Sequence, residues 1–245
     1  MENRNKKLIL VHGDKGGVGK STLAGLAIDY AIQHFGQVAV VEGDEKIDDV
    51  SSRFAGVAGV QGFMVDLARP DASEESVIAL FDELEGAGLP DVVVVNTPAS
   101  ASSTLDRQAK VLVEAAHDMG YSVHVAWMLG PDDSSAALSA ESQLCKLADR
   151  KVAVVNCRFG DGKRFSWTRH KARAVWLESG GFESALPALT DRAITAVQDQ
   201  PGRYSDLAAP GSALSTITRK YVGEWVRAAH EGPVALLFQD AENAE

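Results

Sequence analysis

Short runs of apolar residues alternate along the chain with longer stretches in which apolar residues recur every three to four positions. The short runs predict buried strands, and the longer stretches predict helices that bury one face. The predicted strands cover residues 8–11, 38–41, 92–95, 122–128 and 152–155. The predicted helices cover residues 21–35, 73–84, 104–119, 134–147, 167–179 and 213–230.

The alternation of strand and helix from residue 8 to about residue 155 predicts an α/β fold. We expect one doubly wound, mostly parallel sheet with helices on both faces. Four successive valines at 92–95 are typical of a central strand that is covered on both sides. In the last predicted helix, Leu214, Ile217, Tyr221 and Trp225 form an apolar stripe that we expect to face the core.

A glycine-rich segment, Gly13-Asp-Lys-Gly-Gly-Val-Gly-Lys-Ser-Thr22, lies between the first predicted strand and the first predicted helix. Glycines let backbone N–H groups turn towards a phosphate, and the start of the following helix adds partial positive charge. We expect Lys20 to reach the β- and γ-phosphates of a nucleotide and the Ser21 hydroxyl to hold a magnesium ion, Mg2+. The expected nucleotide-binding residues here are Gly16, Gly17, Val18, Gly19, Lys20, Ser21 and Thr22.

The segment departs from the strict G-x-x-x-x-G-K-[ST] pattern, because Asp14 stands where that pattern requires glycine. The rest of the segment, Lys15-Gly-Gly-Val-Gly-Lys-Ser21, begins with a second lysine and resembles the ParA/MinD family of deviant Walker A ATPases. Motifs that match this family extend from about residue 6 to 160, and the pattern is compatible to about 230. The resemblance implies a P-loop NTPase fold, ATP as ligand, and a homodimer that closes around two ATP–Mg2+. Lys15 would then reach the phosphates held by the partner, and such a cation stabilises transition-state charge only after assembly.

The second motif of this family, Asp-x-Asp-Pro-Gln, corresponds to the end of the second predicted strand. Glu42 replaces the first aspartate, Asp44 keeps the second, and Glu45-Lys46 replaces Pro-Gln. The resemblance implies that Asp44 positions the attacking water. A solvated acidic loop is the alternative interpretation.

The third motif, Asp-x-Pro-Pro in the family, corresponds to Asn96-Thr-Pro-Ala99. Asn96 can accept a hydrogen bond from a metal-bound water, but it contributes no charge. The expected metal site is therefore Ser21 and, through water, Asn96. This departure puts fast hydrolysis in doubt, whereas the phosphate loop is intact.

A late strand ends in Val154-Val-Asn-Cys157, and the resemblance implies that Asn156 contacts adenine. The alternative is an asparagine that ends a strand and caps a turn, a position that this residue type favours. The later stretch Leu186-Pro-Ala-Leu-Thr190 resembles the loop that lies beside the base in the family.

The chain carries 24 basic and 34 acidic residues, a formal net charge of −10, which excludes a wholly basic DNA-binding surface. A local basic segment is interleaved with Phe165, Trp167 and Trp176, and Arg169, Arg173 and Trp176 would share one helix face. Two interpretations remain open: a patch for the phosphates of non-specific duplex DNA, or a solvated face whose arginine stems cover Trp176. The basic residues are Arg158, Lys163, Arg164, Arg169, Lys171 and Arg173.

Membrane attachment is not expected, because no apolar run approaches the length of a membrane span. Residues 234–238 are apolar but precede an acidic tail, 239–245, so we expect a short strand or a packed extension followed by a frayed end. Two cysteines suit a reducing compartment, and we expect a cytoplasmic protein. His12, beside the phosphate loop, is expected to be neutral.

The function that these features favour is a ParA-like ATP-binding and ATP-hydrolysing dimeric switch, with a slow ATPase activity. It would position or segregate plasmid DNA or other cargo, with Lys15, Lys20 and Asp44 as the catalytic residues. We expect one domain over 1–245, with the nucleotide motifs in 8–160 and a helical part at about 160–238.

Two alternatives remain open. The first is a nucleotide-binding adaptor with little or no hydrolysis that acts through a protein partner. The divergent second and third motifs resemble those of plasmid-borne relatives in stability or conjugative-transfer operons, where such an adaptor would act. The second is a small-molecule ligase or kinase on the same scaffold, against which Lys15 argues.

Overall fold

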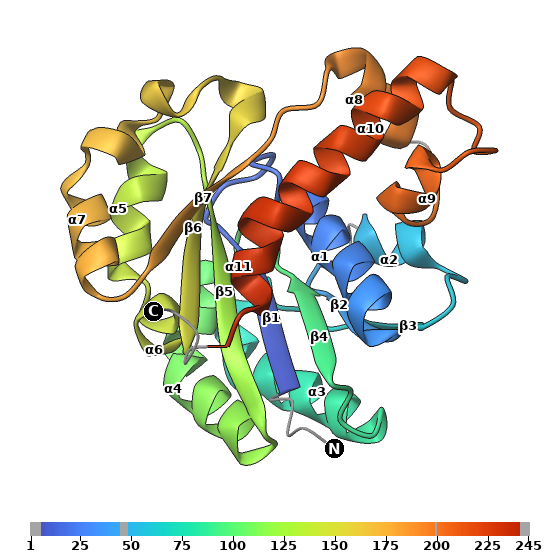
Figure 1. Cartoon of the computed structure of the whole chain (residues 1–245). Helices are drawn as coiled ribbons and strands as arrows, with labels where there is room; N and C mark the ends of the chain where they lie inside the picture. The colour runs from blue at the N-terminus through green and yellow to red at the C-terminus, as the bar shows by residue number, and fades with distance from the viewer. Residues whose placement is uncertain (1–5, 45–48, 199, 241–245) are drawn as a thin grey trace.

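The computed structural model describes residues 6–44, 49–198 and 200–240. Its centre is a seven-stranded sheet in the order β3-β2-β4-β1-β5-β6-β7, and every neighbouring pair is parallel (Figure 1). The strands are β1 (Lys6–His12), β2 (Val38–Glu42), β3 (Val60–Met64), β4 (Val92–Asn96), β5 (Tyr121–Leu129), β6 (Arg150–Asn156) and β7 (Phe182–Leu186). The expected doubly wound α/β fold is confirmed, and the sheet is parallel throughout.

Helices cover both faces of this sheet. On one face lie α1 (Lys20–Phe35), α2 (Val50–Phe54), α8 (Asp191–Gln198), α9 (Tyr204–Ala208), α10 (Thr216–Ala229) and α11 (Ala235–Phe238). On the other lie α3 (Ser73–Gly86), α4 (Ser102–Asp118), α5 (Asp133–Glu141), α6 (Gln143–Leu147) and α7 (Lys171–Glu178). Five short helical turns complete the description: η1 (Pro70–Ala72), η2 (Cys157–Phe159), η3 (Gly162–Arg164), η4 (Ser166–Arg169) and η5 (His230–Val234).

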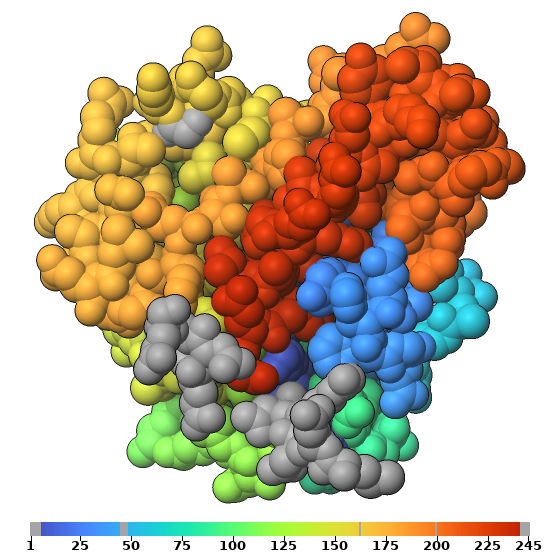
Figure 2. Space-filling view, in the orientation of Figure 1, coloured from blue at the N-terminus to red at the C-terminus, as the bar shows by residue number. Residues whose placement is uncertain are grey.

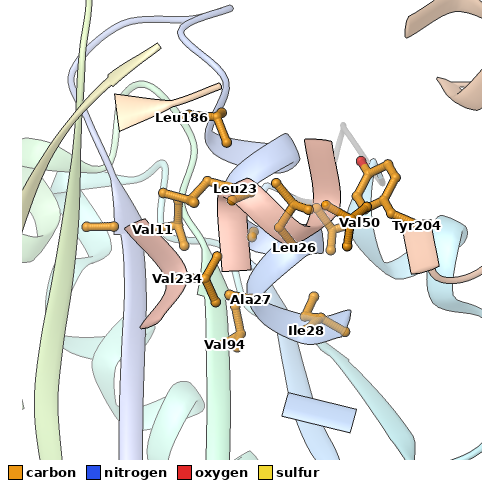
Figure 3. Close-up of a cluster of buried hydrophobic side chains, with 14 of the residues drawn as sticks. Val11, Leu23, Leu26, Ala27, Ile28, Val50, Val94, Leu186, Tyr204 and Val234 are labelled. Carbon is orange, nitrogen blue, oxygen red and sulfur yellow. The ribbon is translucent and has the colours of Figure 1, made fainter. Parts of the chain in front are cut away.

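The central strands supply side chains to two separate cores, because successive residues of a strand point to opposite faces. Val11 and Val94 pack with Leu23 and Ala27 of α1 and with Val234 (Figure 3). Their neighbours Leu10, Val93 and Val95 pack on the opposite face, against α3 and α4. The run of valines at 92–95 is therefore a central strand that is covered on both sides.

The order of the strands positions the candidate site. From β1 the chain passes to β2 and β3 on one side, returns through β4, and then crosses to β5 on the other side of β1. A ligand site in such a sheet lies outside the carboxyl ends of the strands, at the point where the strand order reverses. The glycine-rich loop follows β1 at this point.

Several predicted elements differ from the structure. The strands β3 and β7 were not predicted, and the helix expected over 134–147 is divided at Ser142, whose hydroxyl accepts from the Cys145 N–H. The stripe in α10 is also wrong, because Ile217 and Tyr221 are 62% and 52% exposed. The helix begins only at Thr216, and its buried face is formed by Val222, Trp225, Val226 and Ala229.

Residues 230–238 form the expected packed extension, which is helical, and the alternative of a short strand is wrong. After η5 the chain forms α11, which contacts β5 and β6. The expected fraying is wrong for Gln239 and Asp240: Arg150 Nε donates to the Gln239 carbonyl at 2.9 Å, and Asp240 pairs with Lys7. Residues 241–245 of the tail lie outside the described residues. No helix in the described parts of the chain has the length and apolar character needed to cross a membrane.

Candidate functional site

The glycine-rich loop between β1 and α1 depends on glycine at particular positions. Gly19 has φ +105°, and a Cβ there would lie 2.4 Å from Asn156 Nδ2. A Cβ on Gly13 would lie 2.8 Å from the Met128 carbonyl oxygen. Gly19 also occupies the N-cap of α1 without a capping side chain, so the first amides of this helix are left for an anion.

Lys20 begins α1 and is a buried cation, with 8% of its surface exposed. Its Nζ donates a hydrogen bond to the Lys15 carbonyl at 2.7 Å. Burial lowers the pKa of Lys20 to about 8, against the opposing effect of Asp14. A desolvated ammonium with a neutral acceptor gains most from an anionic ligand.

Ser21 lies where four polar side chains meet at the carboxyl ends of β2 and β4. Its Oγ is 3.3 Å from Asp49 Oδ2 and 3.5 Å from Asn96 Nδ2. Asn96 Nδ2 in turn donates to Glu42 Oε1 at 2.7 Å. These hydroxyl, carboxylate and amide oxygens are the ligand types that Mg2+ prefers, so the residues fit this ion.

Asp44, the expected water-positioning residue, lies two residues beyond the end of β2 and is half-buried. The backbone before it is joined to β4, because the Gly43 N–H donates to the Asn96 carbonyl at 2.9 Å. The structure thus places Asp44 at the same edge of the sheet as Ser21 and Asn96. Glu45 and Lys46 lie outside the described residues.

Lys15 is paired within its own chain. Its Nζ lies 2.5 Å from Asp132 Oδ2, just before α5, and the two side chains are 40% and 43% exposed. The hydrogen bond from Lys15 is the largest of the effects that lower the pKa of Asp132 to about 2. Lys15 is therefore at the surface, whereas Lys20 is buried at the head of the helix.

A cavity of about 350 Å³ adjoins the phosphate loop. In the space-filling view, the segments that carry Arg158 and α8 stand apart at the upper edge of the molecule, with a notch between them (Figure 2). The cavity is lined by Gly17, Gly19, Lys20, Ser21, Thr22, Asp49, Asn156, Arg158, Leu186, Pro187, Leu189, Ile194, Val197, Gln198, Tyr204 and Trp225.

Asn156 is hydrogen-bonded within the chain at the end of β6. Its Nδ2 donates to the Val18 carbonyl at 2.9 Å, and its Oδ1 accepts from the Arg158 N–H at 3.0 Å. It therefore caps the turn after β6, as the alternative supposed, and it also lines the cavity. Its Nδ2 retains a second hydrogen and its Oδ1 a second lone pair, so each atom can form a further hydrogen bond.

Two aromatic residues of the cavity were not identified from the sequence. Tyr204 and Trp225 pack edge to face, with ring centroids 5.2 Å apart. Trp225 Nε1 donates to the Pro187 carbonyl at 2.8 Å, which ties α10 to the loop after β7. Both lie far along the chain from the phosphate loop, and no local pattern marks them as more than core residues.

His12 is fully buried at the end of β1, beside the phosphate loop. Its Nδ1 lies 2.9 Å from Thr97 Oγ1, and its Nε2 lies 3.4 Å from Ser102 Oγ. Burial, and then the charge of Lys20, lower the pKa of His12 to about 3. The expected neutral histidine is found.

The basic segment is divided by the fold. Trp167, Trp176 and Phe165 are buried, so their rings are not available for stacking on bases. Residues 166–169 form η4, so the expected single helix with Arg169, Arg173 and Trp176 on one face is wrong.

The basic side chains also differ among themselves. Arg173 is held by Glu183 through bonds of 2.7 and 2.8 Å, and Arg158 lies 3.9 Å from Asp191. Exposed cations remain at Lys163, Arg164, Arg169 and Lys171.

Comparison with known proteins gives two similarities. The chain is 26% identical over 190 residues to Protein MobD of Acidithiobacillus ferrooxidans, which covers 76% of this chain and 80% of that protein. The structure resembles the MinC:MinD cell division protein complex of Aquifex aeolicus, with a TM-score of 0.50 and 13% identity. This match covers 90% of the present chain and 94% of the other, and it shows that the two chains share a fold. No family model matches the sequence.

Proposed function

We propose that the chain binds ATP with Mg2+ and acts as a nucleotide-dependent dimeric switch. The observation that carries this proposal is the buried Lys20, bonded to a neutral carbonyl at the head of an uncapped helix, beside a cavity of about 350 Å³. Small-ligand sites commonly have volumes of this order. A triphosphate would supply the negative charge that this arrangement favours.

The residues have distinct roles in this proposal. Lys20 and the amides of 16–22 hold the phosphates, while Asn156, Leu186 and Pro187 lie beside the base. Ser21 holds the metal, Asn96 bonds to its water, and Asp44 orients the attacking water. When bound, Mg2+ neutralises phosphate charge and polarises the phosphoryl group that is attacked.

Lys15 would act in the second subunit. Its ion pair with Asp132 is half-exposed, and exposed pairs of this kind contribute little free energy. The side chain can therefore be transferred to the phosphates of a partner at small cost. Dimerisation would thus depend on ATP and on this lysine.

The setting that we propose is plasmid-related. It is supported by the similarity to Protein MobD and by the divergent second and third motifs. DNA is a proposed partner through the exposed cations Lys163, Arg164, Arg169 and Lys171. We further propose that the chain forms one cytoplasmic domain.

A nucleotide-binding adaptor is the second candidate, and Asn96 favours it. An amide at this position carries no charge beside the metal, so hydrolysis would be slow or absent. Single-turnover hydrolysis separates the two candidates. Hydrolysis above that of a Lys20→Ala blank supports the switch, and binding without hydrolysis supports the adaptor.

The dimer is tested by measuring mass in solution with a non-hydrolysable ATP analogue. We expect the wild type to dimerise, and Lys15→Ala to bind the analogue yet remain a monomer. Lys110→Ala, which removes an exposed lysine of α4, serves as the matched control and should dimerise. A Lys15→Ala protein that dimerises like the wild type would contradict the proposed role of Lys15.

A further inference from the structure

We propose that Asp49 supplies the negative charge beside the proposed Mg2+. It would replace the charge that Asn96, an amide, does not carry. This inference rests on the proposed binding of ATP with Mg2+. It concerns a residue that lies outside the three recognised motifs, five positions beyond Asp44.

The position of Asp49 in the structure is the first argument. It stands at the N-cap of α2, but its side chain makes no capping hydrogen bond. Instead its Oδ2 lies 3.3 Å from the Ser21 hydroxyl, and the residue lines the cavity beside the phosphate loop. With its hydrogen donated to this carboxylate, the Ser21 oxygen accepts from Asn96 Nδ2 at 3.5 Å and keeps one lone pair for a cation.

Glu42, the nearby acid that replaces the first aspartate of the second motif, makes other hydrogen bonds. It is 1% exposed; its Oε2 accepts from the Val50 N–H at 3.1 Å, and its Oε1 accepts from Asn96 Nδ2 at 2.7 Å. Glu42 therefore supplies the cap of α2 that Asp49 does not supply. The NH2 group of Asn96 therefore faces Glu42, and its oxygen points away from this carboxyl group.

The second, independent observation is the oxygen of that amide. With Nδ2 turned to Glu42, Asn96 Oδ1 is a buried acceptor without a hydrogen-bond partner among the described residues, on a side chain that is 5% exposed. A buried acceptor left unpaired costs free energy. A metal-bound water would pair it, and Asp49 would supply the charge that an amide lacks.

A further consequence follows for the form of the ligand. Asp49 lies beside the site of the phosphates, so without a cation its charge repels a triphosphate. With the cation present, the same charge is favourable. Asp49 therefore makes binding selective for the metal complex of the nucleotide over the free nucleotide.

The test is the affinity for ATP, measured with excess Mg2+ and again with EDTA, through the fluorescence of Trp225 at the cavity. Trp225→Phe identifies the signal of this residue. We expect the wild type to bind at least about tenfold more tightly with Mg2+, and Asp49→Asn to lose most of that ratio while its affinity in EDTA is unchanged or higher. Asp71→Asn, an exposed acid in η1, is the matched control and should keep the wild-type ratio.

A second variant keeps the test valid if Asp49→Asn is altered in other ways. The double variant Asp49→Asn with Asn96→Asp restores one charge at the other position, and we expect it to regain the Mg2+ dependence. Electron paramagnetic resonance of Mn2+ with ATP should show the same loss and recovery of the ternary complex.

The outcomes separate this inference from the proposed function. The role of Asp49 would be overturned if the wild type bound ATP with a clear Mg2+ dependence and Asp49→Asn had the same ratio of affinities with Mg2+ and with EDTA. The proposed function would not be affected by that result. Failure of the wild type to bind ATP above the Lys20→Ala blank would overturn the proposed function and this inference with it.

Discussion

The two ends of the sheet bury cations in different ways. At the amino end, Lys7 is 4% exposed, and the carboxylate of Asp240 pairs with it. At the carboxyl end, Lys20 is also buried, with 8% of its surface exposed, but its hydrogen bond goes to a neutral carbonyl.

The difference shows at which end of the sheet the chain itself neutralises the buried cation. Burial of a cation is costly unless a partner offsets the lost hydration. Asp240 provides such a partner at one end. At the other end the pKa of Lys20 is lowered to about 8, so the ammonium is less stable there than in water. The carboxyl end is therefore the end at which an anionic ligand gains free energy.

The largest expected effect is a loss of stability at low pH, and it arises from a feature that the two ends of the sheet share. Each buries a histidine, and burial lowers the pKa of His12 to about 3 and of His124 to about 4. Both are neutral in the folded chain, whereas the unfolded chain takes up protons below about pH 6.5. The free energy of unfolding should therefore have its full value above pH 6.5. It should decrease as the pH falls towards 4, by up to about 3 kcal/mol for each histidine.

Denaturant unfolding between pH 7 and 4.5 measures this loss. A His124→Asn variant should show a shallower decline, because it removes one histidine that is neutral in the folded chain and protonated in the unfolded chain. Equal slopes for the wild type and His124→Asn would show that His124 is not held neutral by the fold.

A smaller expected effect, a decrease in ATP affinity at high pH, should arise from the carboxyl end of the sheet alone. Between pH 8 and 10.5 free Lys20 has lost its proton in the folded chain, and a bound phosphate would restore it. Binding then takes up a proton, so the affinity for ATP should fall by about tenfold from pH 7 to pH 9.

Titrations of ATP at both pH values test this effect, with circular dichroism to verify the fold at pH 9. A Lys20→Arg variant that still binds should lose the dependence, because a guanidinium keeps its charge throughout. An affinity of the wild type that is constant from pH 7 to 9 would show that Lys20 is not the titrating contact.

Much of the fold could be predicted from the sequence, because the central strands are continuous apolar runs. Five of the strands are such runs, and the glycine-rich loop marks their common edge. The strands β3 and β7 were missed for a physical reason: they lie at the edges of the sheet, where Gly62 and Glu183 are tolerated and the apolar pattern is lost.

The candidate site could be predicted only where backbone geometry imposes a sequence. Gly19 is required by a positive φ and by the proximity of Asn156, so the loop is visible in the sequence. Asp49 and Trp225 reach the cavity through tertiary packing, and neither residue type is unusual at its position. Sequence periodicity also misplaced Ile217 and Tyr221, since the register of α10 is set by packing on α9 and the loop after β7.

The central claim is that the carboxyl end needs a ligand and the amino end does not, and one pair of matched substitutions tests it. ATP affinity and unfolding free energy should be measured for Lys20→Ala and Lys7→Ala. We expect Lys20→Ala to weaken ATP binding at least about 100-fold with stability within about 1 kcal/mol of the wild type. Lys7→Ala should keep ATP affinity and lose about 1–3 kcal/mol of stability. Unchanged ATP affinity in Lys20→Ala, or equal loss of affinity in both variants, would contradict the account.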